Sequence, residues 1–554
     1  PMNRPFLTLL AFLLHTLISA QFNWQWARAY TGENQPSVEG LVLDAMGNTV
    51  VCGSFFGTLS IGVLPPIMSN GQSDLYIAKF DADGTPLWVR TAGGADFDEA
   101  LDVAVDGEGR ITITGYFQSP SITMGGTTLS RQGNMDILVA QFDAAGDAQW
   151  AQRYGWSASS GLEWGRAIAA DANGDLYVAG QYKSALVVPG LTDLQACNGR
   201  EQGFLLKLDA DGNGLWSLMP LCTGDASLGL TTCDALAIGP DGSVYLGGDF
   251  RGDTAYFATD TLANFMPSGQ SDDGFVVKYS PAGEELWVRA WAGTNYDEIR
   301  ALATDSEGNL LVATTREGGH VIDGIDLPIT GSNGIYRMTL WKSEPDGTAI
   351  WGRRAGDTTF AHEFSTLAVD ANDHVWAGGY YQSRCTFDAI TFPNNGNFEF
   401  YGLFVAHYDA DGVVQEVYTD RAVGPRVVNE LACDATGGLY VGGAYTDAIT
   451  FAPLAPLMGD ASFLAKSDDL TTVVASAQEQ LAWSVSPVPA DKQFTITQGE
   501  GAAIGDLHVL DAMGREVMRA GVWESSITID CSLWPAGSYI LQRGEERQQV
   551  LVVR

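Results

Sequence analysis

Short runs of alternating apolar and polar residues, each preceded by a tight turn, recur along most of the chain. In the clearest copy, Asp171 opens the turn, Gly174 completes it, and residues 176–182 follow with strand periodicity. An aspartate favours such a turn because its side chain bonds the nearby backbone, and glycine takes the positive φ that the turn needs. The alternating run ending in an aromatic residue is typical of a half-buried β-strand. We therefore expect a turn followed by a strand.

This unit recurs at intervals of 62 to 68 residues. Its first positions are Asp44, Asp106, Asp171, Gly239, Asp305, Asp370 and Asp434. Each copy is followed by a second strand, an Asp-x-x-Gly turn and a third strand that carries a tryptophan. These positions are Trp88, Trp150, Trp216, Trp287 and Trp351, with Gln415 in the sixth copy. The last copy ends near Ser467 with no such strand after it, whereas residues 22–30, with Trp26, resemble one. The sequence therefore predicts that the N-terminal strand completes the last repeat.

Closing a ring in this way removes exposed sheet edges. With about four strands in each repeat, the expected fold over residues 21–470 is an all-β, seven-bladed β-propeller closed by the N-terminal strand. The repeat strings resemble the SBBP family of bacterial β-propeller repeats, with its D-x-x-G-N-x-Y-V-x-G-x-F and D-x-F-V-x-K-Y-D-x-x-G patterns. The fifth copy departs most, because Thr314 and Arg316 stand where glycine and an aromatic residue are expected. The resemblance implies a fold and no activity.

The pattern changes after Ser467. Residues 471–482 read as a linker, and residues 483–554 as short alternating strands that suit a small Ig-like β-sandwich. This piece resembles the type A sorting domain of the type IX secretion system of Bacteroidetes. The matching positions are Pro487, Pro489, Asp511, Gly514, Gly537 and Tyr539. Val488 departs from the asparagine usual there, and an ordinary Ig-like domain is the alternative. The resemblance implies that the type IX machinery reads the domain at the outer membrane, and that the protein is then released or attached to surface lipopolysaccharide.

The charge balance and the N-terminal residues bear on location. A net charge of -37 over 554 residues argues against nucleic acid and anionic membranes as partners. Residues 1–20 have a positive start, an apolar run and small residues before Gln21, as a secretory signal peptide does. No other segment is expected to span a membrane. We expect export through the periplasm, with the protein secreted or attached to the outer membrane at the cell surface.

An acidic residue stands shortly before the expected first strand of every repeat. These residues are Glu39, Glu99, Glu163, Asp234, Glu298, Glu363 and Glu430. All are expected near one mouth of the central channel, either as a cation-attracting ring or as an ordinary solvated rim. The longest segments on that face are 181–202, 217–234 and 251–272. The expected function is binding of a protein or a glycan; the alternative is a carbohydrate-active hydrolase or lyase with an acidic site at the channel mouth.

No cofactor is expected. The Asp-x-Asp-Gly turns that begin at Asp81, Asp209 and Asp409 offer fewer oxygens than a calcium loop and are interpreted as hairpin turns, with calcium as the alternative. The histidines show no metal-ligand spacing along the sequence. Only His362 and Glu363 have acid–base character, without a third partner. Export permits disulfides, and we expect one between two of the cysteines in the long loops. Those cysteines are Cys197, Cys222 and Cys233.

Overall fold

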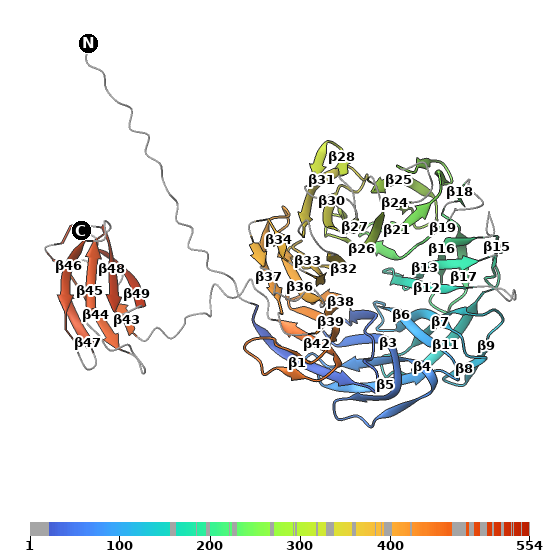
Figure 1. The fold of residues 1–554 in the computed structure, drawn as a ribbon, viewed down its shortest axis with the longest axis horizontal. Coiled ribbons are helices and arrows are strands. Elements are labelled where there is room, and N and C mark those ends of the chain that lie inside the picture. The colour runs from blue at the N-terminus through green and yellow to red at the C-terminus, as the bar shows by residue number, and fades with distance from the viewer. Residues whose placement is uncertain are drawn as a thin grey trace, which may run out of the picture. The chain divides into compact units, whose positions relative to one another are not determined.

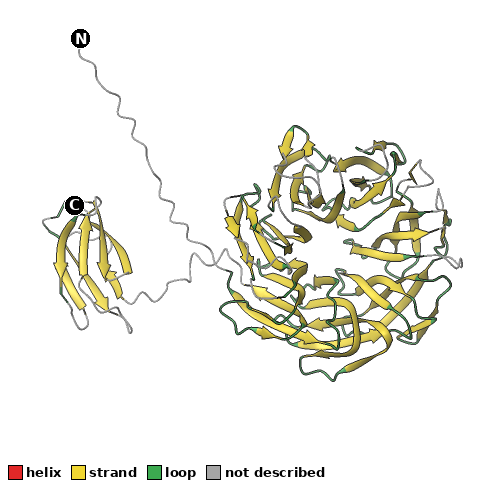
Figure 2. Ribbon diagram, viewed as in Figure 1, coloured by secondary structure: helices red, strands yellow, loops and turns green. Residues whose placement is uncertain are grey.

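The regular elements are all β-strands in the part of the chain that the structure, a computed structural model, describes (Figure 2). That part comprises residues 22–155, 162–183, 185–195, 200–220, 222–223, 230–265, 271–291, 293, 296–316, 320–327, 337–356, 362–382, 384–388, 390–392, 401–420, 424–467, 483–486, 492–498, 507–511, 515–521, 526–532, 534–535, 537–543 and 546–552. The chain divides into two compact units, residues 1–470 and 471–554. The predicted signal peptide (1–20) and linker (471–482) lie outside the described residues.

The turns predicted from the repeat organise the first unit. At Asp44, the carboxylate accepts hydrogen bonds from the backbone N–H groups of Met46 and Asn48, at 2.8 and 2.9 Å. The N–H of Gly47 donates to the Asp44 carbonyl at 2.9 Å, and Gly47 has a φ of 76°. The left-handed conformation there explains why glycine is needed. Each such turn joins the first and second strands of one antiparallel set.

Among the described residues, seven sets of four antiparallel strands follow one another. The first is β2 (Gly40–Leu43), β3 (Thr49–Ile61), β4 (Ile67–Phe80) and β5 (Pro86–Ala92). The second is β6 (Asp98–Val105), β7 (Ile111–Phe117), β10 (Asp136–Phe142) and β11 (Ala148–Tyr154). The third is β12 (Trp164–Ala170), β13 (Leu176–Lys183), β16 (Glu201–Leu208) and β17 (Gly214–Leu218). The fourth is β20 (Ala235–Ile238), β21 (Val244–Arg251), β24 (Asp272–Tyr279) and β25 (Glu285–Trp291), with β19 (Leu230–Thr231) also on β21.

The remaining sets continue the same order. The fifth is β26 (Asp297–Thr304), β27 (Leu310–Arg316), β30 (Arg337–Ser343) and β31 (Ala349–Ala355). The sixth is β32 (His362–Val369), β33 (Val375–Tyr381), β36 (Gly402–Tyr408) and β37 (Val414–Thr419). The seventh is β38 (Arg426–Cys433), β39 (Leu439–Tyr445), β42 (Ala461–Ser467) and β1 (Trp24–Thr31).

Short additional strands lie outside the four-stranded order of these sets. They are β8 (Ser121–Met124) with β9 (Thr127–Ser130), β14 (Ala185–Leu186) with β15 (Leu194–Gln195), β28 (His320–Ile322) with β29 (Ile325–Leu327), and β40 (Ala448–Ile449) with β41 (Leu457–Met458). The strand β18 (Cys222–Thr223) pairs with β22 (Thr254–Tyr256), which pairs with β23 (Thr261–Ala263). The hairpin of β34 (Cys385–Phe387) and β35 (Ile390–Phe392) extends the fifth set beyond β31.

The first strands of the sets form a ring. Each contacts the first strand of the next set, and β38 contacts β2. Figure 1 shows the sets arranged around this ring. Buried clusters lie between neighbouring sets; one combines Val50 and Ile77 of the first with Ile113 and Leu138 of the second. The first unit is therefore an all-β, propeller-like fold.

The predicted pairing of the N-terminal strand with the end of the last repeat is confirmed. In β1, Trp26 is opposite Lys466 of β42, and Ala29 is opposite Phe463. The far end of β1 also pairs with the extended β3, with Tyr30 opposite Ile61. This joins the seventh and first sets into one eight-stranded sheet. At Tyr30, β1 is therefore paired on both sides.

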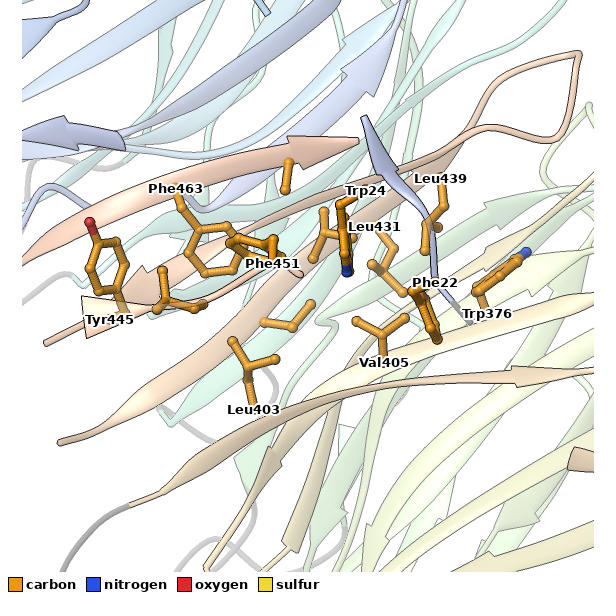
Figure 3. Close-up of a cluster of buried hydrophobic side chains, with 14 of the residues drawn as sticks. Phe22, Trp24, Trp376, Leu403, Val405, Leu431, Leu439, Tyr445, Phe451 and Phe463 are labelled. Atoms are coloured by element: carbon orange, nitrogen blue, oxygen red, sulfur yellow. The ribbon is translucent and has the colours of Figure 1, made fainter. Parts of the chain in front are cut away.

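Buried aromatic side chains hold β1 in place. Trp24 lies 4.7 Å from Phe451 between ring centroids, and Phe22 packs against Trp376 at 5.8 Å (Figure 3). Both belong to a cluster shared by the sixth and seventh sets. Trp24 is only 2 % exposed, and losing a buried tryptophan costs about 3–5 kcal/mol. Packing as well as strand pairing therefore closes the ring.

The tryptophan series packs between sets and also links them by hydrogen bonds. Each indole N–H donates to a backbone carbonyl in the hairpin between the third and fourth strands of the next set. These pairs are Trp26 to Ala82, Trp88 to Ala144, Trp150 to Ala210, Trp216 to Pro281, Trp287 to Pro345 and Trp351 to Ala410, at 3.0 to 3.4 Å. The assignment of Gln415 to this position is wrong by one residue, because His407 is opposite Glu416 as Lys342 is opposite Trp351.

The second unit contains two antiparallel sheets. One has the order β43 (Trp483–Ser486), β44 (Gln493–Gln498) and β47 (Ser526–Asp530). The other has the order β46 (Glu516–Ala520), β45 (Leu507–Asp511), β48 (Gly537–Arg543) and β49 (Glu546–Val552). Ile496 and Ile529 of the first sheet share a buried core with Val509 and Leu541 of the second. A search of the described residues for a helix long and apolar enough to cross a membrane finds none.

Candidate functional site

A cavity of about 570 Å³ lies inside the ring of first strands. Every set contributes to it through its first strand or the residues just before that strand. The lining residues are Glu39, Leu101, Arg166, Gln181, Leu230, Thr232, Asp234, Asp249, Asp272, Glu298, Ile299, Arg300, Glu363, Ser365, Asn429 and Glu430. We call this space the axial cavity.

Irregular pairing in the first strands supplies much of this lining. The register of β12 against β13 shifts between Gly165 and Ala167, and that of β26 against β27 shifts between Ile299 and Ala301. Equivalent shifts in β6, β32 and β38 surround Leu101, Ser365 and Asn429. A β-bulge breaks the alternation of a strand and re-aims the extra side chain. The five bulged positions, Leu101, Arg166, Arg300, Ser365 and Asn429, all line the axial cavity.

The structure brings together five of the seven acidic residues singled out in the sequence. Glu39, Asp234, Glu298, Glu363 and Glu430 line the axial cavity, whereas Glu99 and Glu163 do not. Burial raises the pKa of Glu99, whose carboxylate accepts a hydrogen bond from Ser73 at 3.5 Å. Glu163 is fully buried. The predicted ring is therefore incomplete.

Sequence reasoning missed four charged residues of the cavity. Asp249 and Asp272 lie within strands, and Arg166 and Arg300 occupy bulges. The long segments 181–202, 217–234 and 251–272 do reach the cavity, through Gln181, Asp234 and Asp272. Aligning the first strands of all repeats would have shown that Arg166 and Arg300 occupy equivalent positions. Their exposure to the cavity depends on the bulges.

The two arginines neutralise only part of the acidic lining. Arg300 contacts Glu298 at 2.5 Å and Glu363 at 3.3 Å. Arg166 lies 3.7 Å from Asp234, and its guanidinium stands over the Trp164 ring at 4.9 Å. Glu363 also accepts the Tyr380 hydroxyl at 2.7 Å. Seven carboxyl groups thus share the cavity with two guanidinium groups.

Asp272 is paired with Arg251 at 2.5 Å, whereas the pKa values of Glu39, Asp249 and Glu430 are raised. Burial and the charge of Asp234 raise the pKa of Asp249 well above its usual value, although the Thr232 hydroxyl donates to it at 2.6 Å. Burial and the charge of Asp102 raise the pKa of Glu430. Asp102 of β6 is not part of the lining, but it follows Leu101, which is; burial raises its pKa to about 7, against hydrogen bonds from the backbone of Ile168 and Val103. A cation that entered the cavity would favour the ionised form of these groups and lower their pKa values.

His362 and Glu363 do not form a dyad. They are neighbours on β32, and successive side chains of a strand point to opposite faces. Glu363 lines the axial cavity, whereas His362 is buried and is not part of its lining.

The Asp-x-Asp-Gly segments are hairpin turns, as interpreted. The Asp81 carboxylate accepts hydrogen bonds from the N–H groups of Asp83 and Thr85, at 3.0 and 2.7 Å, and Gly84 donates to the Asp81 carbonyl. The Asp209 and Asp409 turns repeat this pattern. Calcium binding at these turns stays an untested prediction.

The expected disulfide is wrong for Cys233, whose thiol is free and buried. Burial raises the pKa of this thiol well above its usual value, so it is a poor nucleophile. Cys197 and the side chain of Cys222 lie outside what the structure describes.

Among the described residues, Asp370, His374 and His407 form a group with metal-ligating side chains. The spacing of histidines along the sequence gave no sign of it, since 33 residues separate the two histidines. The group lies in the sixth set, and none of its members lines the axial cavity.

Part of the predicted sorting motif lies in described strands of the second unit. Asp511 ends β45 opposite Tyr539 of β48, the strand that Gly537 begins. The Tyr539 ring is buried, and its hydroxyl donates to the Pro535 carbonyl at 2.8 Å. Pro487, Pro489 and Gly514 are outside the described residues.

Comparison with known proteins identifies this second unit. Residues 484–553 match the secretion system C-terminal sorting domain. The chain carries a type IX sorting domain. Its presence indicates secretion, with handling by the type IX machinery.

The first unit has more distant relatives. The chain is 25 % identical over 387 residues to a WD repeat-containing protein of Acanthamoeba polyphaga mimivirus, covering 58 % of this chain and 27 % of that protein. It is 33 % identical over 149 residues to the regulatory protein FlaEY of Caulobacter vibrioides, covering 26 % of this chain and 15 % of FlaEY. Both matches span less than a third of the relative's own length.

Solved structures of similar shape include a catalytically inactive virginiamycin B lyase from Staphylococcus aureus with quinupristin. It has a TM-score of 0.39 and is 9 % identical, and the match covers 79 % of this chain and 98 % of that chain. The description of the first unit as propeller-like rests on its own strand pairing.

Proposed function

We propose that this protein is an exported, seven-bladed β-propeller that binds a protein ligand by taking a cationic side chain into the axial cavity. The observation that carries the proposal is the excess of carboxyl groups over cations there, together with their raised pKa values. A lysine or arginine side chain entering the cavity would offset this excess. A neutral sugar would not, so the cavity favours a protein over the glycan that composition alone left open.

The volume and the lining of the axial cavity support this proposal. Ligand pockets usually have volumes of about 300–1,000 Å³, and the axial cavity falls within that range at about 570 Å³. Its lining also offers neutral hydrogen-bonding groups, including Thr232, Ser365 and Asn429. These groups suit the polar backbone on either side of an inserted side chain.

The test is the binding of a short lysine-rich peptide, compared with the same peptide after acetylation of its lysines, by isothermal titration calorimetry. Glu298→Gln and Asp249→Asn should each weaken binding of the unmodified peptide by about tenfold, or about 1.4 kcal/mol. The matched control is Asp346→Asn, which removes an exposed carboxylate from a hairpin turn outside the cavity. Equal losses in the control and cavity variants would mean that the peptide responds to net charge, and the proposal would be wrong.

A second function has one specific observation in its favour. The pKa of Asp249 is raised by burial and by neighbouring Asp234, and a carboxylic acid with a raised pKa is what a general acid requires. A hydrolase or lyase acting at the channel mouth would use this pair. Release of reducing ends or unsaturated products from polysaccharides, abolished by Asp249→Asn without loss of peptide binding, would select this alternative.

For the second unit we propose an Ig-like sandwich that acts as the export signal, with the mature protein released or held at the outer membrane. The match over residues 484–553 supports this role. Deletion of residues 483–554 should leave a folded first unit that accumulates in the periplasm of a type IX-competent host. Cell fractionation checks this, and surface display of the truncated protein would contradict the sorting role.

A further inference from the structure

In most sets, a lysine from the third strand reaches the aspartate that opens the inner turn. The pairs are Lys79 with Asp44 at 2.8 Å, Lys207 with Asp171 at 3.4 Å, Lys342 with Asp305 at 2.8 Å, and Lys466 with Asp434 at 3.1 Å. In several sets the ammonium also stands over an aromatic ring of the second strand, as Lys466 does over Tyr440 at 4.6 Å. The fold thus provides a repeated place for a cation beside a buried carboxylate.

The sixth set keeps the carboxylate and replaces the groups around it. Asp370 opens the turn, but His407 stands where all other sets except the second, which has Gln141, have lysine. His374 stands where the first and fifth have Asn48 and Asn309. Glu416 is opposite His407, in the place of the tryptophan. These changes all surround the carboxylate of Asp370. They replace a lysine and an asparagine with two imidazole rings.

The resulting cluster has the separations of a metal site. Nε2 of His407 lies 3.2 Å from Nδ1 of His374, which lies 3.7 Å from Oδ2 of Asp370. One ligand atom from each residue falls within 4.8 Å of the others. Two nitrogen ligands at about 2.0–2.1 Å from a tetrahedral zinc ion are about 3.3 Å apart. The distance of 3.2 Å between the two ring nitrogens is therefore close to the value that such an ion imposes.

We propose that Asp370, His374 and His407 bind a zinc ion, which takes the place of the lysine ammonium of the other sets. Histidine nitrogen and carboxylate oxygen are ordinary zinc ligands, and three protein ligands leave a fourth position for water. The side chain of His374 is 27 % exposed, so this fourth position has access to solvent. The other two ligands are buried.

Neighbouring groups hold the ligands in position. The Asp370 Oδ1 atom accepts hydrogen bonds from the N–H groups of Asn372 and His374, at 2.8 and 3.1 Å, which leaves Oδ2 toward the histidines. Trp376 stacks on the His407 ring at 4.1 Å with an interplanar angle of 9°. Glu416 Oε1 lies 3.9 Å from Nδ1, the other ring nitrogen of His407. A carboxylate behind a ligating histidine is the usual arrangement in metal sites.

The test measures zinc bound to the purified full chain by equilibrium dialysis and elemental analysis, after treatment with a chelator. The wild-type protein should bind one zinc ion per chain. The double variant His374→Asn, His407→Lys rebuilds the Asp305, Asn309 and Lys342 arrangement of the fifth set, so it should fold and lose this ion. His508→Gln changes a histidine paired with Glu516 in the second unit and should keep it. Glu416→Gln should weaken zinc binding by about 10–100-fold, as expected for a residue that positions a ligand.

Two further readouts keep the test independent of the variants. Cobalt added to the wild-type apoprotein should develop the visible absorption of a tetrahedral ion, and zinc should raise the thermal midpoint in proportion to the logarithm of its concentration. Absence of zinc binding and of the cobalt spectrum in the wild-type protein would overturn the proposal. So would equal zinc content in the wild-type protein and the folded double variant, and the cluster would then be a hydrogen-bonded imidazole pair.

Discussion

Carboxyl groups in the inner turns and in the axial cavity have opposite electrostatic environments, although they stand only a few residues apart. Glu39 and Asp44 flank the same first strand, β2. Burial raises the pKa of Glu39, with only a partly offsetting hydrogen bond from Ser37. Burial also acts on Asp44, but hydrogen bonds from Lys79 and Asn48 outweigh it and lower that pKa.

The same contrast recurs in the seventh set between Glu430, whose pKa is raised by burial, and Asp434, where hydrogen bonds from Thr436, Gly438 and Lys466 outweigh burial. Burial is common to both places, so it does not decide the outcome. The difference is whether the fold supplies a dedicated cation and hydrogen-bond donors. The turn carboxylates are satisfied within the fold; under the proposed function, a ligand supplies the cation for Glu39, Asp249 and Glu430.

The contrast depends on closure of the ring, because the axial cavity is lined from all sets. Removing residues 22–31 should expose the edge of β42 and the cluster around Phe463. The expected loss in the free energy of unfolding exceeds the cost of one buried tryptophan, about 3–5 kcal/mol, and the free edge should promote aggregation. Thermal unfolding and size-exclusion chromatography check this. An unchanged melting temperature in a monomeric variant would argue against closure by β1.

The sharpest comparison replaces an aspartate with asparagine once in an inner turn and once in the axial cavity. Asp305→Asn removes the charge that faces Lys342 at 2.8 Å in a buried pair, and leaves the ammonium without its carboxylate. The expected cost is about 3 kcal/mol. Asp249→Asn replaces a carboxyl group that already favours its neutral form and should change stability by less than about 0.5 kcal/mol or increase it. Urea unfolding measures both, and equal losses would remove the distinction.

The dependence of stability on pH should also differ in sign. Asp102 has its pKa raised from 3.8 to about 7, so the folded protein holds an extra proton between these values. Its contribution to the free energy of unfolding therefore falls as the pH rises through this window, by at most about 1.4 kcal/mol per pH unit. Asp102→Asn should flatten this slope. Asp305, whose pKa is lowered because bonds from Lys342 and Asn309 outweigh burial, contributes stability that is lost as the pH falls below 3.8.

Differential unfolding curves of wild type and Asp102→Asn over this pH range provide the measurement. A slope that is the same in both proteins would show that Asp102 does not bind the extra proton.

The sequence predicted the inner turns, the strand repeat and the pairing of β1 with β42, because each depends on local turn chemistry or on matching one repeat with the next. The cavity was only half predicted. Glu298 and Glu363 could be chosen from their place before the turns, but Arg166 and Arg300 face the cavity because of β-bulges that have no fixed sequence signal. The Asp370, His374 and His407 cluster was missed because its members meet across two strands. Comparison of His407 with the lysines of the other repeats would have found it.

The central claim is that buried carboxyl groups on the first strands and around the axial cavity have raised pKa values, whereas turn carboxyl groups have lowered ones. It is tested most directly by a carbon-detected NMR titration of protein labelled at the aspartate carboxyl carbon, with Asp102 of β6 and Asp305 of an inner turn as the two probes. Assignments come from the signals lost in Asp102→Asn and Asp305→Asn. The account predicts that the Asp102 signal titrates near pH 7 and the Asp305 signal below 3.8. Titration of both signals together near the usual aspartate pKa of about 3.9 would contradict it.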